Sequence, residues 1–365
     1  MSRHTQLCIF VPEWDNGGVE RMMANLMRGI AAHGITVDLL QNTRNDHYLE
    51  DLPTGIRRVQ LEADKPSYLL DKTRQYLADT RPECLLSAKD TSHNLALNAQ
   101  RSAGVDTRVF LRFASNISQK YAHRNALKRW WIRHGLRRSC RRADGLLAVS
   151  QGVADDIHTT TGLNVQTLPN PVISGQLHSL AGEPAPHPWL SEHDIPVILG
   201  AGRLGRAKNF ALLIEAFARL HRERRCRLII LGEGRQRERL LRQAEKLGVS
   251  DDVSLPGYTD NPFAWLARAN VFALSSNWEG SPNILVEALA LGTPAVSTDC
   301  PSGPREILAD GRFGPLVAMG DAVALAAALE QTLDAPLSAG HLKQAACPYT
   351  LEASTQAYLQ AMALT

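Results

Sequence analysis

The segment NWEGSPNILVEALALGTPAVST, residues 277–298, carries two glutamates, Glu279 and Glu287, with seven residues between them. Ser281 suits the N-cap of a helix and Pro282 suits its first position, so the sequence predicts that a helix begins here. Glu279 would precede this helix, and Glu287 would lie about 8 Å deeper along it. Carboxylates accept hydrogen bonds in pairs, and neighbouring sugar hydroxyls offer such pairs of donors.

The start of this helix is also a candidate anion site. The amides of Asn283 and Ile284 would point at a bound anion, and the helix dipole would favour its negative charge. One anion-binding helix start with two flanking hydroxyl acceptors is what a nucleotide-sugar requires. The alternative is that Glu279 only complements the helix dipole and that Glu287 is a solvated helix residue.

A second cluster lies in GAGRLGRAKNF, where Arg203 and Lys208 occupy a loop between an apolar run and a helix. Arginine can bond two oxygens of a diphosphate, and lysine adds a point charge. The alternative is a solvated basic loop. The next apolar run ends in Gly-x-Gly at residues 232–234, where the backbone could again meet a ligand.

Near the amino terminus, PEWDNGGVERMMANLM places Gly17 and Gly18 between a strand-like run and a helix. Two glycines allow the backbone to approach a ligand at the start of a helix. A tight strand-to-helix turn without a ligand is the other interpretation.

The elements that must position these residues are short apolar runs that alternate with amphipathic helical patterns. This alternation is typical of α/β proteins with parallel sheets covered on both faces. The first series of runs covers residues 6–11, 36–40, 84–88, 108–113, 145–150 and 165–170. The second covers residues 196–202, 227–234, 252–258, 270–276, 294–298 and 315–318. A stretch rich in Pro, Gly and Ser, 171–189, divides them, so we expect two Rossmann-like doubly wound domains facing a ligand-binding cleft.

Composition sets the class of protein. A chain of 365 residues with 44% hydrophobic and 21% charged residues fits two globular domains. It has no uncharged apolar run of membrane-spanning length and no signal-peptide pattern at its start, and its six cysteines are scattered, which favours reduced thiols in the cytoplasm. Residues 107–143 contain 11 Lys or Arg and no Asp or Glu; subtracting these 11 charges from the net charge of +3 leaves −8 for the rest.

Taken together, these segments resemble glycosyltransferase family 4, a large group of retaining enzymes with the GT-B architecture. The resemblance covers nearly the whole chain, and the two-glutamate element with its following GTPAVS is its most specific part. Further matching segments are residues 17–40, 146–157, 168–172, 201–220 and 231–258.

The resemblance implies a role for each candidate residue. Arg203 and Lys208 would neutralise the diphosphate of a nucleotide-sugar, and Glu279 would bind hydroxyls of the transferred sugar. These three are the predicted catalytic residues. The predicted substrate-binding residues are Glu287 at the ribose, Ser281, Asn283 and Ile284 at the diphosphate helix start, Tyr258 beside the base, and Gly17 and Gly18 in a loop that closes over the phosphates.

The resemblance also implies the domain bounds. It places an acceptor-side domain at 1–172, a linker at 173–195, a nucleotide-sugar domain at 196–348 and a final helical segment at 349–365 that returns to the first domain.

The implied reaction follows from charge. Departure of the sugar builds negative charge on the diphosphate, which Arg203, Lys208 and the helix start at Pro282 would stabilise. Family members retain the anomeric configuration and need no metal or other cofactor. The sequence contains no Asp-x-Asp, the motif of the metal-dependent alternative fold. A UDP-linked hexose or N-acetylhexosamine is the expected donor, and an α-glycosidic bond the expected product.

One departure from the family concerns a histidine that many members carry at the end of a strand in the first domain. The corresponding segment here, LRFASNIS at 111–118, contains no histidine. Arg112, Ser115 and Asn116 are candidates to replace it, and His93 after the preceding strand is another. The alternative for His93 is a residue at a helix start or on the surface.

The basic region gives a hypothesis for the acceptor. Residues 119–142 combine cations with Trp130, Trp131 and Leu127, which suits an anionic membrane surface. We therefore expect a cytoplasmic protein, peripheral on the inner face of the membrane, that acts on a lipid-linked oligosaccharide or lipopolysaccharide. Alternatively, this is a solvated helix whose tryptophans pack inward.

Two other functions compete with glycosyl transfer. A nucleotide-sugar epimerase has the same architecture but makes no glycoside. Binding of nucleic acid or another anionic polymer would use the basic segment, but no nucleic-acid module is recognisable in the sequence.

Overall fold

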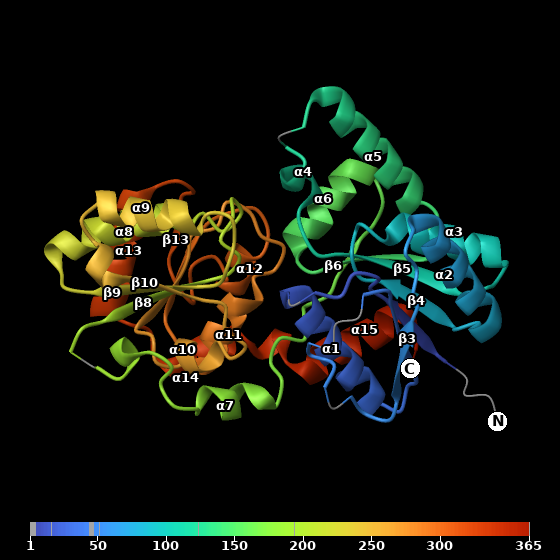
Figure 1. Cartoon of the computed structure of the whole chain (residues 1–365), viewed down its shortest axis with the longest axis horizontal. Coiled ribbons are helices and arrows are strands. Elements are labelled where there is room, and N and C mark those ends of the chain that lie inside the picture. Colours follow the sequence, from blue (N-terminus) through green and yellow to red (C-terminus); the bar gives the residue numbers. More distant parts are fainter. Residues whose placement is uncertain are drawn as a thin grey trace. The chain divides into compact units, whose positions relative to one another are not determined.

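The computed structural model describes residues 5–15, 17–43, 47–50, 52–122, 124–192 and 194–364. The chain divides into two compact units (Figure 1). Unit 1 consists of Met1–Val172 and Thr350–Thr365, and unit 2 consists of Ile173–Tyr349. Each unit has its own parallel sheet and its own apolar clusters, so each positions its strand ends independently.

The described strands of unit 1 form one parallel sheet in the order β3-β2-β1-β4-β5-β6-β7. Their bounds are Leu7–Phe10 for β1, Val37–Gln41 for β2, Ile56–Gln60 for β3, Cys84–Ser87 for β4, Arg108–Phe113 for β5, Gly145–Ala148 for β6 and Gln166–Thr167 for β7. The order reverses direction at β1, which is the doubly wound arrangement that the alternating pattern predicted.

Strand β3 is the one strand of this described sheet that the sequence did not predict. Its residues IRRVQ hold only two apolar side chains, because β3 lies at the sheet edge and its arginines are exposed. Arg57 forms an ion pair with the fully buried Asp38 of β2, and Tyr76 donates a hydrogen bond of 2.7 Å to the same carboxylate. A buried carboxylate, rather than an apolar pattern, therefore holds this edge.

The helices of unit 1 cover both faces of its sheet. Their bounds are Gly18–Ala32 for α1, Pro66–Thr80 for α2, His93–Ala103 for α3, Ile117–Lys120 for α4, Ala126–Cys140 for α5, Gln151–Thr161 for α6 and Leu351–Met362 for α15. Apolar residues of α1 and α15 share one cluster, and those of α2, α3 and α6 share the other.

Helices α1 and α15 approach each other closely at Gly29. A Cβ at this position would lie 2.1 Å from Thr355 Oγ1, so only glycine allows this contact without a shift. The carboxyl-terminal segment is thereby packed onto the first helix of unit 1.

The described strands of unit 2 form a parallel sheet in the order β10-β9-β8-β11-β12-β13. Their bounds are Val197–Ala201 for β8, Arg227–Leu231 for β9, Val253–Gly257 for β10, Val271–Leu274 for β11, Ala295–Thr298 for β12 and Leu316–Val317 for β13. The helices are α7 (Gln176–Ala181), α8 (Phe210–Glu223), α9 (Arg237–Lys246), α10 (Phe263–Leu266), α11 (Asn283–Leu291), α12 (Pro304–Ile307), α13 (Ala322–Asp334) and α14 (Ala339–Gln344).

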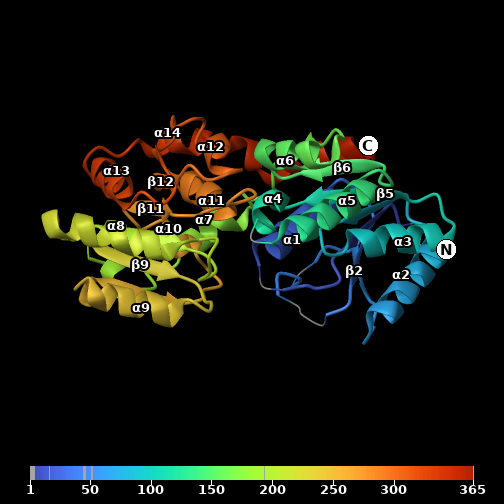
Figure 2. The same cartoon turned by 90° about the horizontal axis from the view of Figure 1, so that it is seen from above.

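In unit 2, helices α8, α9 and α13 lie on one side of the sheet, and α10, α11 and α14 lie on the other (Figure 1). Figure 2 shows α13, α8 and α9 side by side, with α8 in the middle. Both faces of this sheet are thus covered, as the near-continuous apolar character of its strands requires.

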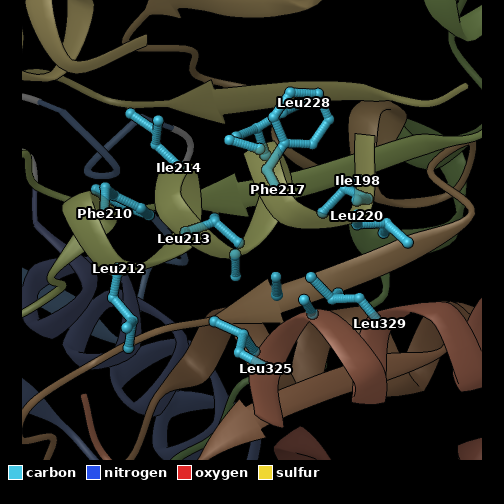
Figure 3. Close-up of a cluster of buried hydrophobic side chains, with 14 of the residues drawn as sticks. Ile198, Phe210, Leu212, Leu213, Ile214, Phe217, Leu220, Leu228, Leu325 and Leu329 are labelled. Atoms are coloured by element: carbon cyan, nitrogen blue, oxygen red, sulfur yellow. The ribbon is translucent and has the colours of Figure 1, made fainter. Parts of the chain in front are cut away.

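Helix α8 shows how the sequence pattern becomes packing. Its apolar residues Phe210, Leu213, Phe217 and Leu220 recur at helical spacing, and all are buried. In Figure 3 they lie in one cluster with side chains of the neighbouring sheet and of α13. This packing fixes the amino-terminal end of α8, which follows the loop that carries Arg203 and Lys208.

The stretch 173–195, which we expected to be a linker, belongs to unit 2 and carries helix α7 and a 3-10 turn at Pro188–Leu190. Arg268 donates hydrogen bonds to the Ala181 carbonyl at 2.9 Å and to the Glu183 carbonyl. The Pro-rich composition therefore marks a packed connection rather than a free one.

Candidate active site

The two predicted cations, Arg203 and Lys208, both lie in the loop that follows strand β8, but their environments differ. Arg203 is exposed, and no hydrogen bond or ion pair of its side chain is found within the described part of the chain. The Lys208 side chain is only 18% exposed, and its ammonium lies 2.6 Å from Glu279 Oε1. One cation is therefore available to solvent, while the other already has an anionic partner.

Glu279 is held by more than this ion pair. Its carboxylate is 12% exposed, and the Ser276 hydroxyl donates to the same oxygen at 2.5 Å. Its amide donates to the Pro301 carbonyl at 3.3 Å. The structure thus brings Lys208 and Glu279, 71 residues apart in sequence, into direct contact at the carboxyl ends of β8 and β11.

The loops that carry Lys208 and Glu279 are fastened to each other. Asn277 donates from its amide to the Ala207 carbonyl at 2.7 Å and from Nδ2 to the Arg206 carbonyl at 2.8 Å. Asn209 Nδ2 donates to Asn277 Oδ1 at 3.2 Å, and the Ser275 hydroxyl donates to the Lys208 carbonyl at 2.9 Å. The separation of the two charged groups is therefore set by a hydrogen-bonded frame.

The two-glutamate element forms helix α11, but its start differs by one residue from the prediction. Pro282, rather than Ser281, is the N-cap, because its ψ of 94° is extended and the helix begins at Asn283. The Ser281 hydroxyl is buried and finds no hydrogen-bond partner within the described residues. Asn283 and Ile284 occupy the first turn of the helix and are half-buried.

Glu287 lies in the second turn of α11 and is 1% exposed. This burial excludes the alternative that Glu287 is a solvated helix residue. Carboxylates are rarely buried without a specific purpose, because loss of hydration costs free energy.

The Gly-x-Gly turn at 232–234 packs closely against the loop that follows β8. Gly232 has φ of +123°, and a Cβ there would lie 2.1 Å from the Gly202 carbonyl oxygen. A Cβ at Gly234 would lie 2.4 Å from the Leu204 carbonyl oxygen. These glycines allow the loops after β8 and β9 to pack together, and the predicted contact of this turn with a ligand stays a prediction.

Tyr258 directly follows strand β10 and is 47% exposed. Its position at the carboxyl end of a strand in the same sheet as Lys208 and Glu279 is compatible with the predicted place beside a base.

In unit 1, His93 begins helix α3 and is buried. Its Nδ1 lies 2.9 Å from the Ser87 hydroxyl, and its ring meets Phe113 edge-on at 4.9 Å. Burial lowers the pKa of His93 to about 4, so the ring is neutral at pH 7. His93 is therefore a helix-start residue that packs in the core rather than a surface histidine.

Arg112 is also buried, with 1% of its surface exposed. Its guanidinium donates to the Tyr358 hydroxyl at 2.9 Å, to Asn170 Oδ1 at 2.9 Å and to the Ala88 carbonyl at 3.4 Å. These partners tie α15 to strand β5, which argues for a structural role rather than for contact with a substrate.

The other strand ends of unit 1 serve as caps and turns. Asn116 caps α4 by accepting a hydrogen bond of 3.0 Å from the Gln119 amide, and Ser115 is half-buried beside it. Gly17 is the N-cap of α1, and Gly18 is the first residue of that helix and is exposed. The half-buried Gly17 and the exposed Gly18 thus form the start of α1.

Sequence reasoning missed Lys89, which fastens the loop before α1. Its ammonium lies 2.5 Å from Glu20 and 3.6 Å from Asp15, and it donates to the Glu13 carbonyl at 2.5 Å. The signal was its place two residues beyond the carboxyl end of β4. Ser276 was missed too, although it stands three residues before Glu279.

Cys300 lies near the pair formed by Lys208 and Glu279. Burial, with a further contribution from the Glu279 charge, raises the pKa of the Cys300 thiol to about 12. The thiol is therefore protonated at neutral pH and adds no charge beside the pair.

Helix α5 carries most of the basic segment. Trp130 and Trp131 are 55% and 61% exposed, and Leu127 is exposed as well. The alternative in which the tryptophans pack inward is therefore wrong. Arg142 fastens the end of this segment to α3 through the Asn98 side chain and the Leu97 carbonyl, each at 3.0 Å.

The described residues contain no group of three or more His, Cys, Asp or Glu side chains placed to hold a metal ion. No helix among them has the length and apolar character needed to cross a membrane.

Comparison with known proteins shows several relatives. The chain is 43% identical over 120 residues to the N-acetylgalactosamine-N,N'-diacetylbacillosaminyl-diphospho-undecaprenol 4-alpha-N-acetylgalactosaminyltransferase of Campylobacter jejuni, a match that covers 33% of this chain and 32% of that protein. It is 38% identical over 175 residues to the lipopolysaccharide core biosynthesis glycosyltransferase LpsE of Rhizobium meliloti, covering 47% and 50%. The matches thus span a third to a half of these relatives' lengths.

Solved structures match over the whole chain. HepE of Anabaena, in complex with UDP and glucose, has a TM-score of 0.81 at 15% identity and covers 99% of this chain and 100% of that one. The lipopolysaccharide outer core galactosyltransferase WaaB has a TM-score of 0.74 at 21% identity, and 99% of each chain is covered. These structures share the GT-B fold with this chain.

Two family models match in series along the chain. The model of Glycosyltransferase Family 4 matches residues 16–174, and the model of Glycosyl transferases group 1 matches residues 185–347. Each model covers one of the two doubly wound units, and together they leave only short segments unmatched. The chain therefore belongs to the family 4 type of glycosyltransferases with the GT-B fold.

Proposed function

We propose that this protein is a glycosyltransferase that moves a hexose or N-acetylhexosamine from a UDP-sugar to a sugar acceptor of a cell-envelope glycan, with retention and an α-glycosidic product. The acceptor is a lipid-linked oligosaccharide or a lipopolysaccharide. The family assignment supports transfer, and the names of the relatives, which act on undecaprenol-linked sugars or lipopolysaccharide core, support the acceptor class.

The contact between Lys208 and Glu279 is the observation that carries the proposal. An ammonium and a carboxylate lie 2.6 Å apart, beside the start of α11, with Arg203 exposed on the same loop as Lys208. Lys208, Arg203 and the helix start bind the diphosphate, while Glu279 accepts hydrogen bonds from the sugar.

The main requirement of the reaction is that the leaving group is stabilised, and it does not require a nucleophilic side chain of the protein. As the bond between the anomeric carbon and the phosphate oxygen breaks, negative charge grows on the diphosphate, and Lys208 and Arg203 stabilise it. Same-face attack by the acceptor hydroxyl, whose proton passes to the leaving phosphate, then gives retention. No metal ion takes part in this proposal.

A binding screen followed by product analysis tests the function. We expect UDP, and one of UDP-glucose, UDP-galactose or UDP-N-acetylglucosamine, to raise the melting temperature, because a ligand of the folded state stabilises it by mass action. UDP release that depends on an added glycan acceptor then supports transfer. Sugar isomerisation without acceptor would instead support an epimerase, which the relatives do not favour.

We further propose that the protein binds the inner face of the cytoplasmic membrane through residues 119–142. The exposed Trp130 and Trp131, among cations on the surface of α5, support this interaction. Tryptophans settle at the interface, and each nearby Lys or Arg contributes about 1 kcal/mol on an anionic surface.

Vesicle co-sedimentation tests the membrane proposal. We expect binding at low salt to phosphatidylglycerol vesicles and little binding to phosphatidylcholine vesicles. The double substitution Trp130→Ala/Trp131→Ala should reduce binding, whereas Tyr68→Ala, which removes an exposed aromatic ring on helix α2, should not. Equal binding of both variants, or no binding of the wild type, would exclude this surface.

A further inference from the structure

Lys208 and Glu279 are paired with each other, although the proposed donor needs each of them for a different group. The ammonium lies 2.6 Å from Oε1, and both side chains are mostly buried. Water therefore screens this attraction only in part. A diphosphate that recruits the ammonium must weaken its bond to the carboxylate.

Ser276 keeps Glu279 in place during such an exchange. Ser276 is fully buried, and its hydroxyl donates to the same Oε1 at 2.5 Å. Its own carbonyl accepts a hydrogen bond of 2.6 Å from the Thr298 hydroxyl on the neighbouring strand. The carboxylate therefore cannot follow the ammonium toward a phosphate, and Ser276 acts as a positioning residue.

We propose that Glu279 is the counter-ion that Lys208 exchanges for the diphosphate, and that this exchange discriminates the nucleotide-sugar from the spent nucleoside diphosphate. The inference rests on the proposed function. In a bound donor, the sugar hydroxyls donate hydrogen bonds to Glu279, and these bonds offset the weakening of the ion pair. A spent nucleoside diphosphate takes the ammonium but lacks the sugar whose hydroxyls would bond to Glu279, so a mostly buried carboxylate loses its cation.

The proposal predicts that one substitution in the site tightens the binding of UDP, whereas loss of a site residue usually weakens the binding of a ligand. Glu279→Gln removes the competing charge, so we expect UDP to bind about tenfold more tightly than to the wild type. The affinity for the UDP-sugar should not rise in parallel, because the amide is a weaker acceptor for the sugar hydroxyls. The ratio of the two dissociation constants, measured by titration calorimetry, is therefore the decisive quantity.

Three further variants separate the possible causes. Lys208→Met should weaken UDP binding, because it removes the cation itself. Ser276→Ala should shift the ratio in the same direction as Glu279→Gln but less, and Ser276→Thr should restore it. Glu215→Gln is the matched control, because this carboxylate of α8 pairs with Arg219 at 3.1 Å, and its loss should leave UDP binding unchanged.

The outcomes distinguish failure of this inference from failure of the proposed function. If Lys208→Met weakens UDP binding but neither Glu279→Gln nor Ser276→Ala tightens it relative to the UDP-sugar, the counter-ion exchange is wrong and the donor site stands. If UDP and UDP-glucose, UDP-galactose and UDP-N-acetylglucosamine all fail to bind the wild type, both are wrong. If Glu215→Gln also tightened UDP binding, the effect of Glu279→Gln would be explained by a general change in charge, and the counter-ion exchange would be wrong.

Discussion

The carboxyl ends of the strands carry charged and polar residues in both units, but the two units use them differently. In unit 1, Arg112 is 1% exposed and spends its donors on Tyr358, Asn170 and Ala88. In unit 2, Lys208 and Glu279 keep a partial exposure and contact each other. The same topology thus yields a structural clamp in one sheet and a candidate reaction site in the other.

This difference teaches that the place of a charged residue in the topology does not decide its role. The buried guanidinium of Arg112 uses three of its five N–H donors to connect parts of unit 1. A lysine that meets one carboxylate can exchange that partner for a phosphate, because both are anions. Burial and hydrogen-bond satisfaction separate the two cases.

The sharpest test of the comparison is a matched pair of substitutions, of which Lys208→Met should have the larger effect. Its loss should lower kcat/KM about 10³-fold, or about 4 kcal/mol of transition-state stabilisation, because it removes the ammonium that we propose stabilises the leaving diphosphate. The unfolding free energy of the Lys208→Met variant should stay within about 1 kcal/mol of that of the wild type. If the variant turned over substrate at close to the wild-type rate, Lys208 of unit 2 would not be a catalytic residue.

Arg112→Met should do the reverse. Loss of three hydrogen bonds from a buried guanidinium should lower the unfolding free energy by about 3 kcal/mol, measured by urea denaturation. The fraction that remains folded should keep most of its turnover. A fully stable but inactive variant would show that Arg112 contacts the substrate after all.

His93 offers a test by pH. Its pKa is lowered to about 4 in the folded state from 6.5, so the unfolded state binds more protons between these values and stability falls as the pH falls through this window. From pH 7 to pH 5, this residue should account for a loss of about 2 kcal/mol. His93→Gln should show a correspondingly smaller pH dependence of unfolding. Identical pH profiles would place the histidine in a hydrated site.

The smallest stability effect should come from helix α5. Because Trp130 and Trp131 are largely exposed, Trp130→Ala/Trp131→Ala should change the unfolding free energy by less than about 0.5 kcal/mol. Urea denaturation in the absence of vesicles measures this effect. A loss of several kcal/mol would mean that these rings belong to the core of unit 1.

Much of the fold could be predicted because buried parallel strands are visible in the sequence as apolar runs. The strands of both sheets were found in this way, with the exception of β3, where burial of Asp38 rather than of apolar side chains holds the edge. The start of α11 was shifted by one residue, because Pro282 satisfies the φ of a helix but adopts an extended ψ.

The site could be predicted less completely, because spacing along the chain does not reveal partners across it. Lys208 and Glu279 were each selected for a ligand, yet nothing in either segment indicates that they contact each other. Arg112 and His93 were candidates for a place near the reacting sugar, and the sequence did not reveal that Arg112 bonds to Tyr358 of α15 or that His93 packs against Phe113. The sequence likewise did not reveal that the Gly-x-Gly turn packs against the loop that follows β8.

The division of unit 1 into two distant stretches of sequence has a consequence for biosynthesis. Tyr358, Leu359 and Met362 of α15 belong to the same apolar cluster as strand β1 and helix α1. On the ribosome, these residues emerge only after all of unit 2 has been translated, so the apolar side chains of unit 1 that pack against α15 stay uncovered while unit 2 is synthesised. The first unit to leave the exit tunnel is thus the last to finish folding.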